Sequence, residues 1–502
     1  MLARRPARRP PRHRPATLPS VSVLFWTLLT IVNYAAVAAA IVFILRSRKE
    51  PAAMMAWILT LLLLPVLGLI LFLLIGDSRI TRQVRRRRHR RASIAQSLAR
   101  RIAGMESWHA RVEARRMVRR LRDLVRIASA VGHLPPTLGN KVTIYQDPER
   151  VFLALSLAME AARKHIHVEY YIFQPDDTGR AIRDLLIRKA REGVKVRVLL
   201  DAVGSWSLTR EFIDAFRQGG VELSFFLPVH FSPTLFRLNC RNHRKLVVVD
   251  GTVGFTGSKN IGDEYLGRRK KLGPWRDTNL RIEGPAALHL QDTFIEDWHF
   301  VAGQDLSHDD SLFPKPPDDG PAAVQIVPSG PDHERDSLHI LLLSAMGTAR
   351  RSIDIITPYF VPDAGMALAM KAAAMRGVKV RLLVPVRSDS WFVLWAGRSY
   401  YREMIDAGIQ IFEYLDGMLH SKVVIVDQSW SLVGSANMDV RSFRLNFEVT
   451  ALLYNEELSQ ELSAEFITLS ERARRFTVED AEKWNFGESL ALGLTRLASP
   501  LL

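Results

Sequence analysis

Two copies of one polar pattern occur in the chain with identical spacing. In each copy one residue separates a histidine from a lysine, four separate that lysine from an aspartate, and six separate the aspartate from a Gly-Ser-x-Asn sequence. A match at every position in two places makes chance a poor explanation. The first copy is His243, Lys245, Asp250, Ser258 and Asn260, and the second is His420, Lys422, Asp427, Ser435 and Asn437.

These residue types are suited to the transfer of a phosphoryl group. An imidazole can attack phosphorus and form a phosphohistidine, while a second imidazole protonates the leaving alkoxide and later deprotonates the incoming alcohol. The lysines and asparagines would supply positive charge and hydrogen-bond donors to the phosphate oxygens. No step of this scheme requires a metal ion. Ser258 and Ser435 are either phosphate contacts or simple turn residues, and the sequence leaves both interpretations open.

A β-strand is the element that would position each His-Lys pair. Residues i and i+2 of a strand point to one face, so each histidine projects together with its lysine. The apolar runs 246–249 and 423–426 then form the buried part of that strand. A single His or Lys on a strand is usually a core or solvated residue, but two copies at fixed spacing disfavour that interpretation.

The segments around the motifs repeat as well. The β-rich runs 166–173 and 353–360 are each followed by a helical stretch and by a nearly identical Gly-Val-Lys-Val-Arg strand. This alternation predicts an α/β fold of two pseudo-symmetric α/β/α lobes, with the motifs meeting at the interface between them. The predicted boundaries are residues 139–304 for the first lobe, 305–321 for an acidic, proline-rich linker and 322–502 for the second lobe.

Two uncharged apolar runs precede the lobes. Residues 21–45 and 51–75 are each long enough to cross the roughly 30 Å hydrocarbon core as a helix, and only a tight hairpin fits between them. A cleaved signal peptide is the weaker interpretation, because the first run is too long and a second follows directly. The predicted N-terminal segments are a basic leader at 1–20, a two-helix transmembrane hairpin at 21–75 and a basic helical connector at 76–138.

The formal charge of +17 is concentrated beside these apolar runs. Residues 1–20 hold six arginines and residues 79–91 hold eight, which leaves residues 92–502 close to neutral. By the positive-inside rule both flanks, and with them the catalytic region, should face the cytoplasm. A nearly neutral catalytic region argues against a nucleic-acid substrate. Cys240 is the only cysteine, which excludes an intrachain disulfide and a thiolate metal cluster.

The duplicated H-x-K-x4-D and G-S-x-N motifs resemble those of the phospholipase D superfamily. Further stretches are similar to its cardiolipin synthase branch, as is the N-terminal hairpin, and the resemblance covers residues 20–502, nearly the whole chain. The clearest of these stretches are RNHRK at 241–245, NIGDEYLG at 260–267, WRDT at 275–278, TPYFVPD at 357–363 and GMLHSK at 417–422.

The resemblance implies a role for each residue of the site. His243 would be the nucleophile and His420 the general acid and base. An acidic residue about 30 positions after each histidine would orient its ring. Asp277 and Glu448 stand at those positions. The motif aspartates, Asp250 and Asp427, would be more structural than catalytic.

The activity implied by the resemblance is transfer of a phosphatidyl group from one phosphatidylglycerol to another, which yields cardiolipin and glycerol. It would take place at a bacterial-type inner membrane, with anionic lipids as partners and without cofactor, metal or nucleic acid. Three rivals remain: a hydrolytic phospholipase D with water as acceptor, a nucleic-acid phosphodiesterase and a non-catalytic membrane scaffold. The oligomeric state is not indicated.

One apolar run lies outside the motifs. Trp391, Phe392 and Trp395 fall within five consecutive residues of the second half. Interfacial lipid contact would explain such a cluster, and so would ordinary core packing. Both interpretations are open from the sequence.

Overall fold

The computed structural model describes residues 21–47, 51–73, 111–227, 240–268, 273–332 and 336–499. The chain divides into two units, residues 1–77 and 78–502. Three predicted features lie wholly or partly outside the described residues: the basic leader 1–20, the arginine-rich run 79–91 and the connector up to residue 110.

The N-terminal unit contains three apolar helices in its described part. α1 (Val21–Leu45) is unbroken, and its segment Phe25–Leu45 is long and apolar enough to cross a membrane, the only such helix among the described residues. The second apolar run forms two shorter helices, α2 (Pro51–Leu63) and α3 (Pro65–Leu71). The three helices pack on one another around a small apolar core.

The break between α2 and α3 departs from the expected pair of uninterrupted helices. Proline lacks an N–H and disfavours helical geometry at the residue before it, so Pro65 ends α2, and Leu64 has φ −129° and ψ 69°. The chain then turns back on α2, since a Cβ added to Gly68 would lie 2.6 Å from the carbonyl oxygen of Thr60. Residues eight apart in a continuous helix are about 12 Å apart. The hairpin prediction is therefore met only in part.

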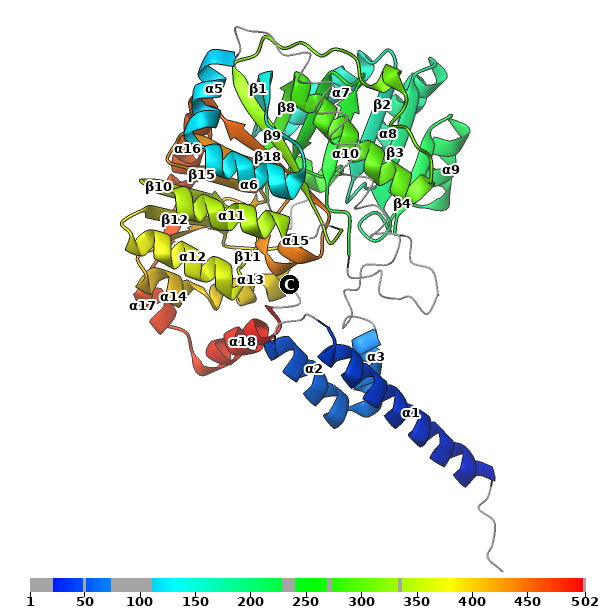
Figure 1. Cartoon of the computed structure of the whole chain (residues 1–502), viewed down its shortest axis with the longest axis vertical. Coiled ribbons are helices and arrows are strands. Elements are labelled where there is room, and N and C mark those ends of the chain that lie inside the picture. The colour runs from blue at the N-terminus through cyan, green and yellow to red at the C-terminus, as the bar shows by residue number, and fades with distance from the viewer. Residues whose placement is uncertain are drawn as a thin grey trace, which may run out of the picture. The chain divides into compact units, whose positions relative to one another are not determined.

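The second unit is built on one mixed β-sheet of fifteen strands within the described residues (Figure 1). Its order is β19-β13-β12-β10-β15-β16-β18-β9-β1-β8-β6-β5-β2-β3-β4. The first-half strands are β1 (Thr137–Tyr145), β2 (His165–Tyr170), β3 (Lys195–Asp201), β4 (Glu222–Phe226), β5 (Lys245–Val249), β6 (Val253–Gly257) and β8 (Asn279–Glu283). The second-half strands are β9 (Ala322–Ser329), β10 (Ser352–Ile356), β12 (Lys379–Pro385), β13 (Gln410–Tyr414), β15 (Val423–Val426), β16 (Trp430–Gly434), β18 (Glu448–Tyr454) and β19 (Ala473–Phe476).

The strand order confirms the predicted repeat. Outward from the central β1–β9 pair, the strands β8, β6, β5, β2, β3 and β4 of one half correspond to β18, β16, β15, β10, β12 and β13 of the other. β2 runs parallel to β3 and antiparallel to β5, as β10 does to β12 and β15. The two halves join edge to edge through the antiparallel β1–β9 pair, which lies between the green β8 of the first half and the orange β18 of the second half (Figure 1).

Helices cover both faces of the sheet, as predicted. In β5, Leu246 and Val248 face a core that contains α10 and α16, whereas Val247 and Val249 face a core with α7, α8 and α9. The helices of the first half are α7 (Pro148–Glu160), α8 (Asp177–Arg191), α9 (Arg210–Gln218), the 3-10 turn η3 (Asp263–Leu266) and α10 (Pro285–Ala302). Those of the second half are α11 (Ser337–Thr348), α12 (Ala364–Met375), α13 (Trp391–Arg398), α14 (Tyr401–Asp406), α15 (Val440–Arg444), α16 (Glu456–Glu471), α17 (Val478–Glu482) and α18 (Phe486–Leu497).

The described part of the predicted connector belongs to the catalytic unit. α5 (Arg111–Arg120) and α6 (Arg122–Gly132) form there, and α6 packs its buried Leu124, Ala128 and Val131 against α11 and β9. α6 ends before the two prolines, with His133 in a left-handed conformation. The predicted linker is also packed, because Leu306 and Leu312 are buried in the central core beside the 3-10 turn η4 (Asp310–Leu312).

Candidate active site

Each His-Lys pair lies at the start of a central strand of its half. Lys245 is the first residue of β5, and Lys422 directly precedes β15. Both lysines are buried, and each Nζ donates to the carbonyl of the histidine two residues earlier, at 2.7 Å for Lys245 and 2.6 Å for Lys422. The two motif copies therefore adopt the same local conformation, and all residues of β5 and β15 that follow the lysines are buried as predicted.

The backbone of each motif is hydrogen-bonded to the opposite half. His243 N donates to the Phe447 carbonyl at 2.9 Å, and Phe447 N donates to the Arg241 carbonyl at 2.8 Å. In the other copy, His420 N donates to the Arg276 carbonyl at 2.7 Å, and the short strands β14 and β7 run parallel. β14 is Met418–Leu419, and β7 is Trp275–Arg276. Each histidine is thereby held beside the residue that directly precedes a carboxylate of the other half, Glu448 for His243 and Asp277 for His420.

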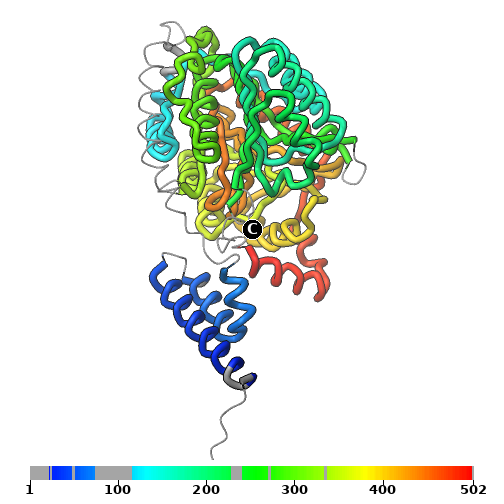
Figure 2. Tube along the Cα trace, turned by 90° about the vertical axis from the view of Figure 1, so that its right-hand side faces the viewer, coloured from blue at the N-terminus to red at the C-terminus, as the bar shows by residue number. Residues whose placement is uncertain are grey.

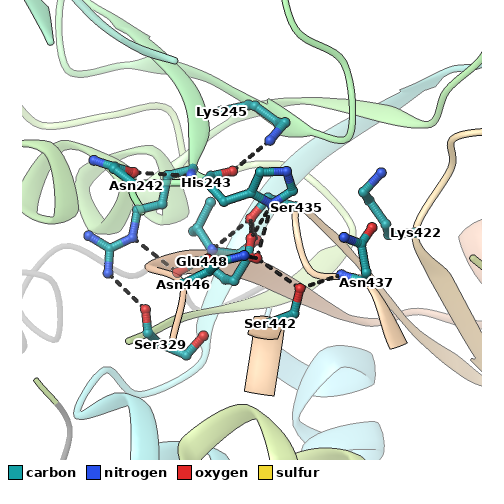
Figure 3. Close-up of polar contacts among 12 residues, drawn as sticks. Asn242, His243, Lys245, Ser329, Lys422, Ser435, Asn437, Ser442, Asn446 and Glu448 are labelled. Atoms are coloured by element: carbon teal, nitrogen blue, oxygen red, sulfur yellow. Dashed lines mark hydrogen bonds and ion pairs between the residues drawn. The ribbon is translucent and has the colours of Figure 1, made fainter. Parts of the chain in front are cut away.

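The carboxylates cross between the halves. Glu448 presents both of its oxygens to Nδ1 of His243 at 2.9 Å (Figure 3), and Oδ1 of Asp277 lies 2.7 Å from Nδ1 of His420. The sequence order had suggested the reverse, with each carboxylate serving the histidine of its own half, and that pairing is wrong. The reason is that β8 and β18 flank the central β1–β9 pair, so their starts lie beside the opposite motif.

The crossed pairs fix which ring nitrogen faces the substrate. An ionised carboxylate can only accept a hydrogen bond, so Nδ1 of each imidazole carries a proton. The reactive nitrogen is then Nε2, with its lone pair available when the ring is neutral. His243 is 9% exposed and His420 is 5% exposed, so both rings are largely shielded from water without being sealed.

The motif serines hold the carboxylates, a role that the sequence did not suggest. Ser258 Oγ donates to Oδ1 of Asp277 at 2.7 Å, and Ser435 Oγ donates to Oε2 of Glu448. Both hydroxyls are fully buried and also accept from the backbone, Ser258 from Thr278 N at 3.0 Å. Neither serine is free to bind a phosphate, so both orient the residues that orient the imidazoles.

The motif asparagines differ between the halves. Asn260 is fully engaged with protein, because its Oδ1 accepts from Ile172 N at 3.2 Å and its Nδ2 donates to the Tyr265 hydroxyl at 3.1 Å. The side-chain oxygen of Asn437 has no hydrogen-bond partner in the part of the chain that the structure describes. Figure 3 shows Asn437 and Lys422 across from the His243 ring. Of the two motif asparagines, Asn260 is therefore the one whose side-chain oxygen is held by the described protein.

Burial and the crossed charges set the protonation of the site. Burial lowers the pKa of His243 to about 4, against the attraction of Glu448, and burial likewise lowers the pKa of His420. Burial alone would raise the pKa of Glu448, but the charge and hydrogen bond of His243 outweigh it and lower the pKa to about 2. Burial lowers the pKa of Lys422 to about 8. At neutral pH a neutral His243 therefore faces an ionised Glu448 and a cationic Lys422.

The motif aspartates lie away from the imidazoles. Asp250 accepts from the backbone N–H groups of Arg163, Lys164 and His165 at 2.7–2.9 Å, at the start of β2. Asp427 does the same at the start of β10. Both have positive φ, 51° and 53°, a conformation that aspartate adopts more readily than most residues. Each lies at the far end of its motif strand from the histidine. The five residues of β5 span about 16 Å at 3.3 Å per residue.

Arg244, between His243 and Lys245, is a site residue that sequence reasoning missed. It is fully buried, with Nε donating to the Glu448 carbonyl at 3.0 Å and Nη2 to the Ser329 carbonyl at 3.2 Å, and its guanidinium pairs with Asp297. It therefore links the first motif to β18 and β9 of the second half. The signal available in the sequence was a third basic residue within RNHRK, directly before the apolar run of β5.

Aromatic rings complete the surroundings of both imidazoles. The Tyr171 ring meets the His243 ring edge-on with centroids 5.0 Å apart, and Trp275 meets His420 in the same way at 5.1 Å. Each ring restricts the rotation of its imidazole and limits the access of water. Two imidazoles, oriented by carboxylates and flanked by buried lysines, form a site suited to double displacement at phosphorus. Among the described residues no group of three or more His, Cys, Asp and Glu side chains is arranged to hold a metal ion.

Comparison with known proteins gives the family of the chain. Residues 155–298 and 342–470 match the family described as cardiolipin synthase, PLD-like domain, and residues 35–76 match the family described as phospholipase D-nuclease N-terminal. A cardiolipin synthase of Geobacillus kaustophilus (strain HTA426) is 40% identical over 92% of this chain and 91% of its own length. The major cardiolipin synthase ClsA of Bacillus subtilis (strain 168) is 36% identical over 96% of this chain and 100% of its own length.

A solved structure supports the fold. Phosphatidylserine synthase of Haemophilus influenzae Rd KW20 aligns with 76% of this chain and 100% of its own, with a TM-score of 0.60 at 16% sequence identity. At this identity the likeness concerns the fold alone. The match of both halves to one family model and the high identity over nearly the whole length show that the chain belongs to the cardiolipin synthase family of the phospholipase D superfamily.

Proposed function

We propose that the chain is a phosphatidyltransferase that makes cardiolipin from two molecules of phosphatidylglycerol. The observation that carries the proposal is the pair of buried imidazoles, each oriented through Nδ1 by a carboxylate of the other half and accompanied by a lysine. This arrangement provides two proton-handling groups and two lysine side chains for one phosphodiester. The names of the curated relatives supply the substrate class.

The reaction would proceed in two displacements. Nε2 of His243 attacks the phosphorus of the first phosphatidylglycerol and the bond to the headgroup oxygen breaks. His420, which enters this step protonated on both ring nitrogens, donates its Nε2 proton to that oxygen, which releases glycerol. A headgroup hydroxyl of the second phosphatidylglycerol then gives its proton to His420 and attacks the phosphorus of phosphatidyl-His243. The P–N bond breaks, cardiolipin departs, and both rings return to their initial protonation. Such a scheme gives ping-pong kinetics.

The electrostatics of the site support His243 as the nucleophile. A pKa of about 4 leaves its ring neutral, so that the Nε2 lone pair is available at physiological pH. Glu448 would stabilise the positive charge that the ring gains on attack, and Ser435 and Ser442 in turn hold Glu448 in place. Lys245, Lys422 and Asn437 would contact the equatorial oxygens of the phosphorus in the transition state.

The N-terminal unit supports a membrane location. We place α1 across a bacterial inner membrane, with the rest of the hairpin beside it and the catalytic unit on the cytoplasmic side. The eight arginines of residues 79–91, at the start of the catalytic unit, are the basis for this orientation. An enzyme held at the bilayer meets its acceptor lipid at high local concentration, which favours transfer over hydrolysis.

One assay tests the proposal. The purified full-length protein is incubated in detergent micelles with phosphatidylglycerol alone, and cardiolipin, glycerol and phosphatidic acid are quantified for wild type, His243→Ala and His420→Ala. Cardiolipin and glycerol should appear in equal amounts with the wild type and disappear in both variants. Phosphatidic acid as the only product would instead establish a hydrolase, and cardiolipin formed equally by the variants would exclude this site.

A further inference from the structure

Two strongly exposed tryptophans occupy matching positions in the repeat. Trp206 is 84% exposed and follows the end of β3 by five residues, while Trp391 is 67% exposed and follows the end of β12 by six. β3 and β12 are equivalent strands, each parallel to the strand that pairs with a motif strand. A large apolar side chain is thus displayed to solvent in the same loop of both halves.

The Trp206 loop is anchored beside the first imidazole. Ser205 Oγ donates to the carbonyl of Tyr171 at 3.0 Å, and a Cβ on Gly204 would lie 2.2 Å from that same oxygen, so the loop sits tightly on Tyr171. The Tyr171 ring in turn contacts the His243 ring. Trp206 therefore stands at the rim of the site on the side of the first half, held by a loop that has little freedom to move.

The Trp391 loop is anchored beside the second imidazole. Asp389 accepts from the Tyr359 hydroxyl at 2.6 Å, and Tyr359 packs against the buried cluster of Tyr265, Trp275 and Met418, in which the Trp275 ring contacts His420. Ser390 then caps α13, and Trp391 is the first residue of the helix. Phe392 and Trp395 are half-buried, so of the apolar run noted in the sequence only Trp391 is strongly exposed.

Further exposed groups extend this edge of the catalytic unit. α18 packs against α13, side by side with it in both views (Figures 1 and 2), and displays a stripe of exposed apolar residues. Arg210 and Arg387 are exposed, each four residues from one of the tryptophans. The residues of the stripe, with their exposure, are Phe486 (85%), Leu490 (53%), Leu494 (58%) and Leu497 (80%).

We propose that this edge docks on the surface of a bilayer of anionic phospholipid, with Trp206 and Trp391 inserted at the headgroup level on either side of the two imidazoles. Tryptophan has an apolar body and a polar N–H, and it accumulates at the membrane–water interface for that reason. The flanking arginines match the negative surface potential of such a bilayer. The docking rests on the proposed function in one respect: a phosphodiester in the headgroup layer would reach the buried histidines without its acyl chains leaving the membrane.

The test uses fluorescent labels on the full-length protein reconstituted in phosphatidylglycerol vesicles. Cys240→Ala removes the native thiol, and Trp206→Cys or Trp391→Cys then provides one site for an environment-sensitive dye. Both labelled positions should show blue-shifted emission and strong quenching by lipids that carry a quencher on the upper acyl chain. This readout does not depend on catalysis, so it stands or falls separately from the proposed activity.

Met375→Cys in the same background is the matched control. Met375 is 81% exposed and apolar, but it precedes β12, whereas Trp391 follows it. A seven-residue strand is about 23 Å long, so the control reports on the opposite end of β12 from Trp391. Its dye should stay unquenched.

Equal quenching at all three positions, or none at either tryptophan site, would overturn the proposal. A blue shift that grows with protein concentration in detergent and ignores the lipid quencher would point to a second copy of the chain instead, and would overturn it as well.

Activity on two forms of substrate provides an independent arm. In Trp206→Ala/Trp391→Ala, the ratio of turnover on vesicles to turnover on a short-chain, monomeric phosphatidylglycerol should fall about tenfold, equivalent to ~1.4 kcal/mol of lost binding. Replacement by phenylalanine should restore most of the ratio. A ratio unchanged by the alanines would count against docking even if cardiolipin is formed, whereas a wild type that forms no cardiolipin from either substrate would count against the proposed function alone.

Discussion

Replacement of Glu448 by glutamine should show whether the crossed imidazole–carboxylate pair acts in catalysis, rather than only in stability as an ordinary buried charge would. Glu448 is completely buried, with both oxygens 2.9 Å from His243 Nδ1 and with Ser435 and Ser442 donating to it. Its pKa of about 2, against the usual 4.5, corresponds to ~3 kcal/mol at 1.36 kcal/mol per pKa unit. Because the pKa is depressed, this stabilisation is present above pH 4.5 and is lost as the pH falls towards 2.

The loss in rate follows from the same interaction. About 3 kcal/mol less stabilisation of the ring charge that develops on attack slows the chemical step by roughly a hundredfold. A glutamine amide can also present its N–H groups to Nδ1 and so move the ring proton to Nε2, and a comparable carboxylate-to-amide change in a serine protease triad costs about 10⁴. Glu448→Gln should therefore lower the turnover of phosphatidylglycerol between about 10² and 10⁴-fold, measured as cardiolipin formed in micelles per folded molecule.

Glu413→Gln is the matched control. Glu413 is equally buried and ion-paired, with Arg398 and Arg474, but it lies in β13 and contacts neither imidazole. It should lower the melting temperature of the protein with little effect on turnover per folded molecule. A Glu448→Gln protein that is folded and keeps half of the wild-type turnover would refute the role given to the crossed carboxylate.

Three further predictions follow from the site. Turnover should fall at low pH through about 4, because His243 gains a proton there and loses its nucleophilic lone pair. It should also fall at high pH through about 8, because Lys422 loses its charge. In a pH–rate profile, Lys422→Arg should move this alkaline limb to higher pH. Ser435→Ala and Ser258→Ala should each lower turnover about 10- to 100-fold, because a hydrogen bond to a charged group contributes about 1.5–3 kcal/mol, and rates that stay at the wild-type level would show that the carboxylates need no such support. Asp427→Ala should lower the free energy of unfolding by about 3 kcal/mol in denaturant titrations, since it leaves several backbone N–H groups unpaired. Its loss of turnover per folded molecule should be far smaller than that of Glu448→Gln. A stable but inactive Asp427→Ala variant would contradict the placement of Asp427 outside the site.

Much of the fold was accessible from the sequence because the repeat states each element twice. The buried strands after Lys245 and Lys422 follow from period-two geometry and apolar runs, and the parallel neighbours follow from the repeated Gly-Val-Lys-Val-Arg segments. The break in the second apolar run was also visible, since Pro65 lies in its middle. Mean hydropathy reflects only how apolar a segment is, and it takes no account of the backbone N–H that Pro65 lacks. The expectation of an uninterrupted helix was wrong for that reason.

The crossing of the carboxylates could not be obtained from spacing. Asp277 and Glu448 were both identified, but which imidazole each one meets depends on the order of strands in a shared sheet, and two separate lobes would have given the same sequence pattern. The roles of Ser258 and Ser435 were missed for a related reason. A turn serine and a serine that supports a buried carboxylate differ only in what a distant strand places beside them.

The antiparallel pairing of β1 with β9 makes one sheet of two repeats. As a result, each repeat supplies the carboxylate that keeps the histidine of the other repeat reactive. A substitution at the start of β18 would be felt first at His243, more than two hundred positions earlier in the chain, and a substitution before β8 would be felt at His420. Neither half expressed by itself would contain a complete imidazole–carboxylate couple. The sequences of the two halves are consequently expected to change together, because a change near a carboxylate in one half impairs the histidine of the other half.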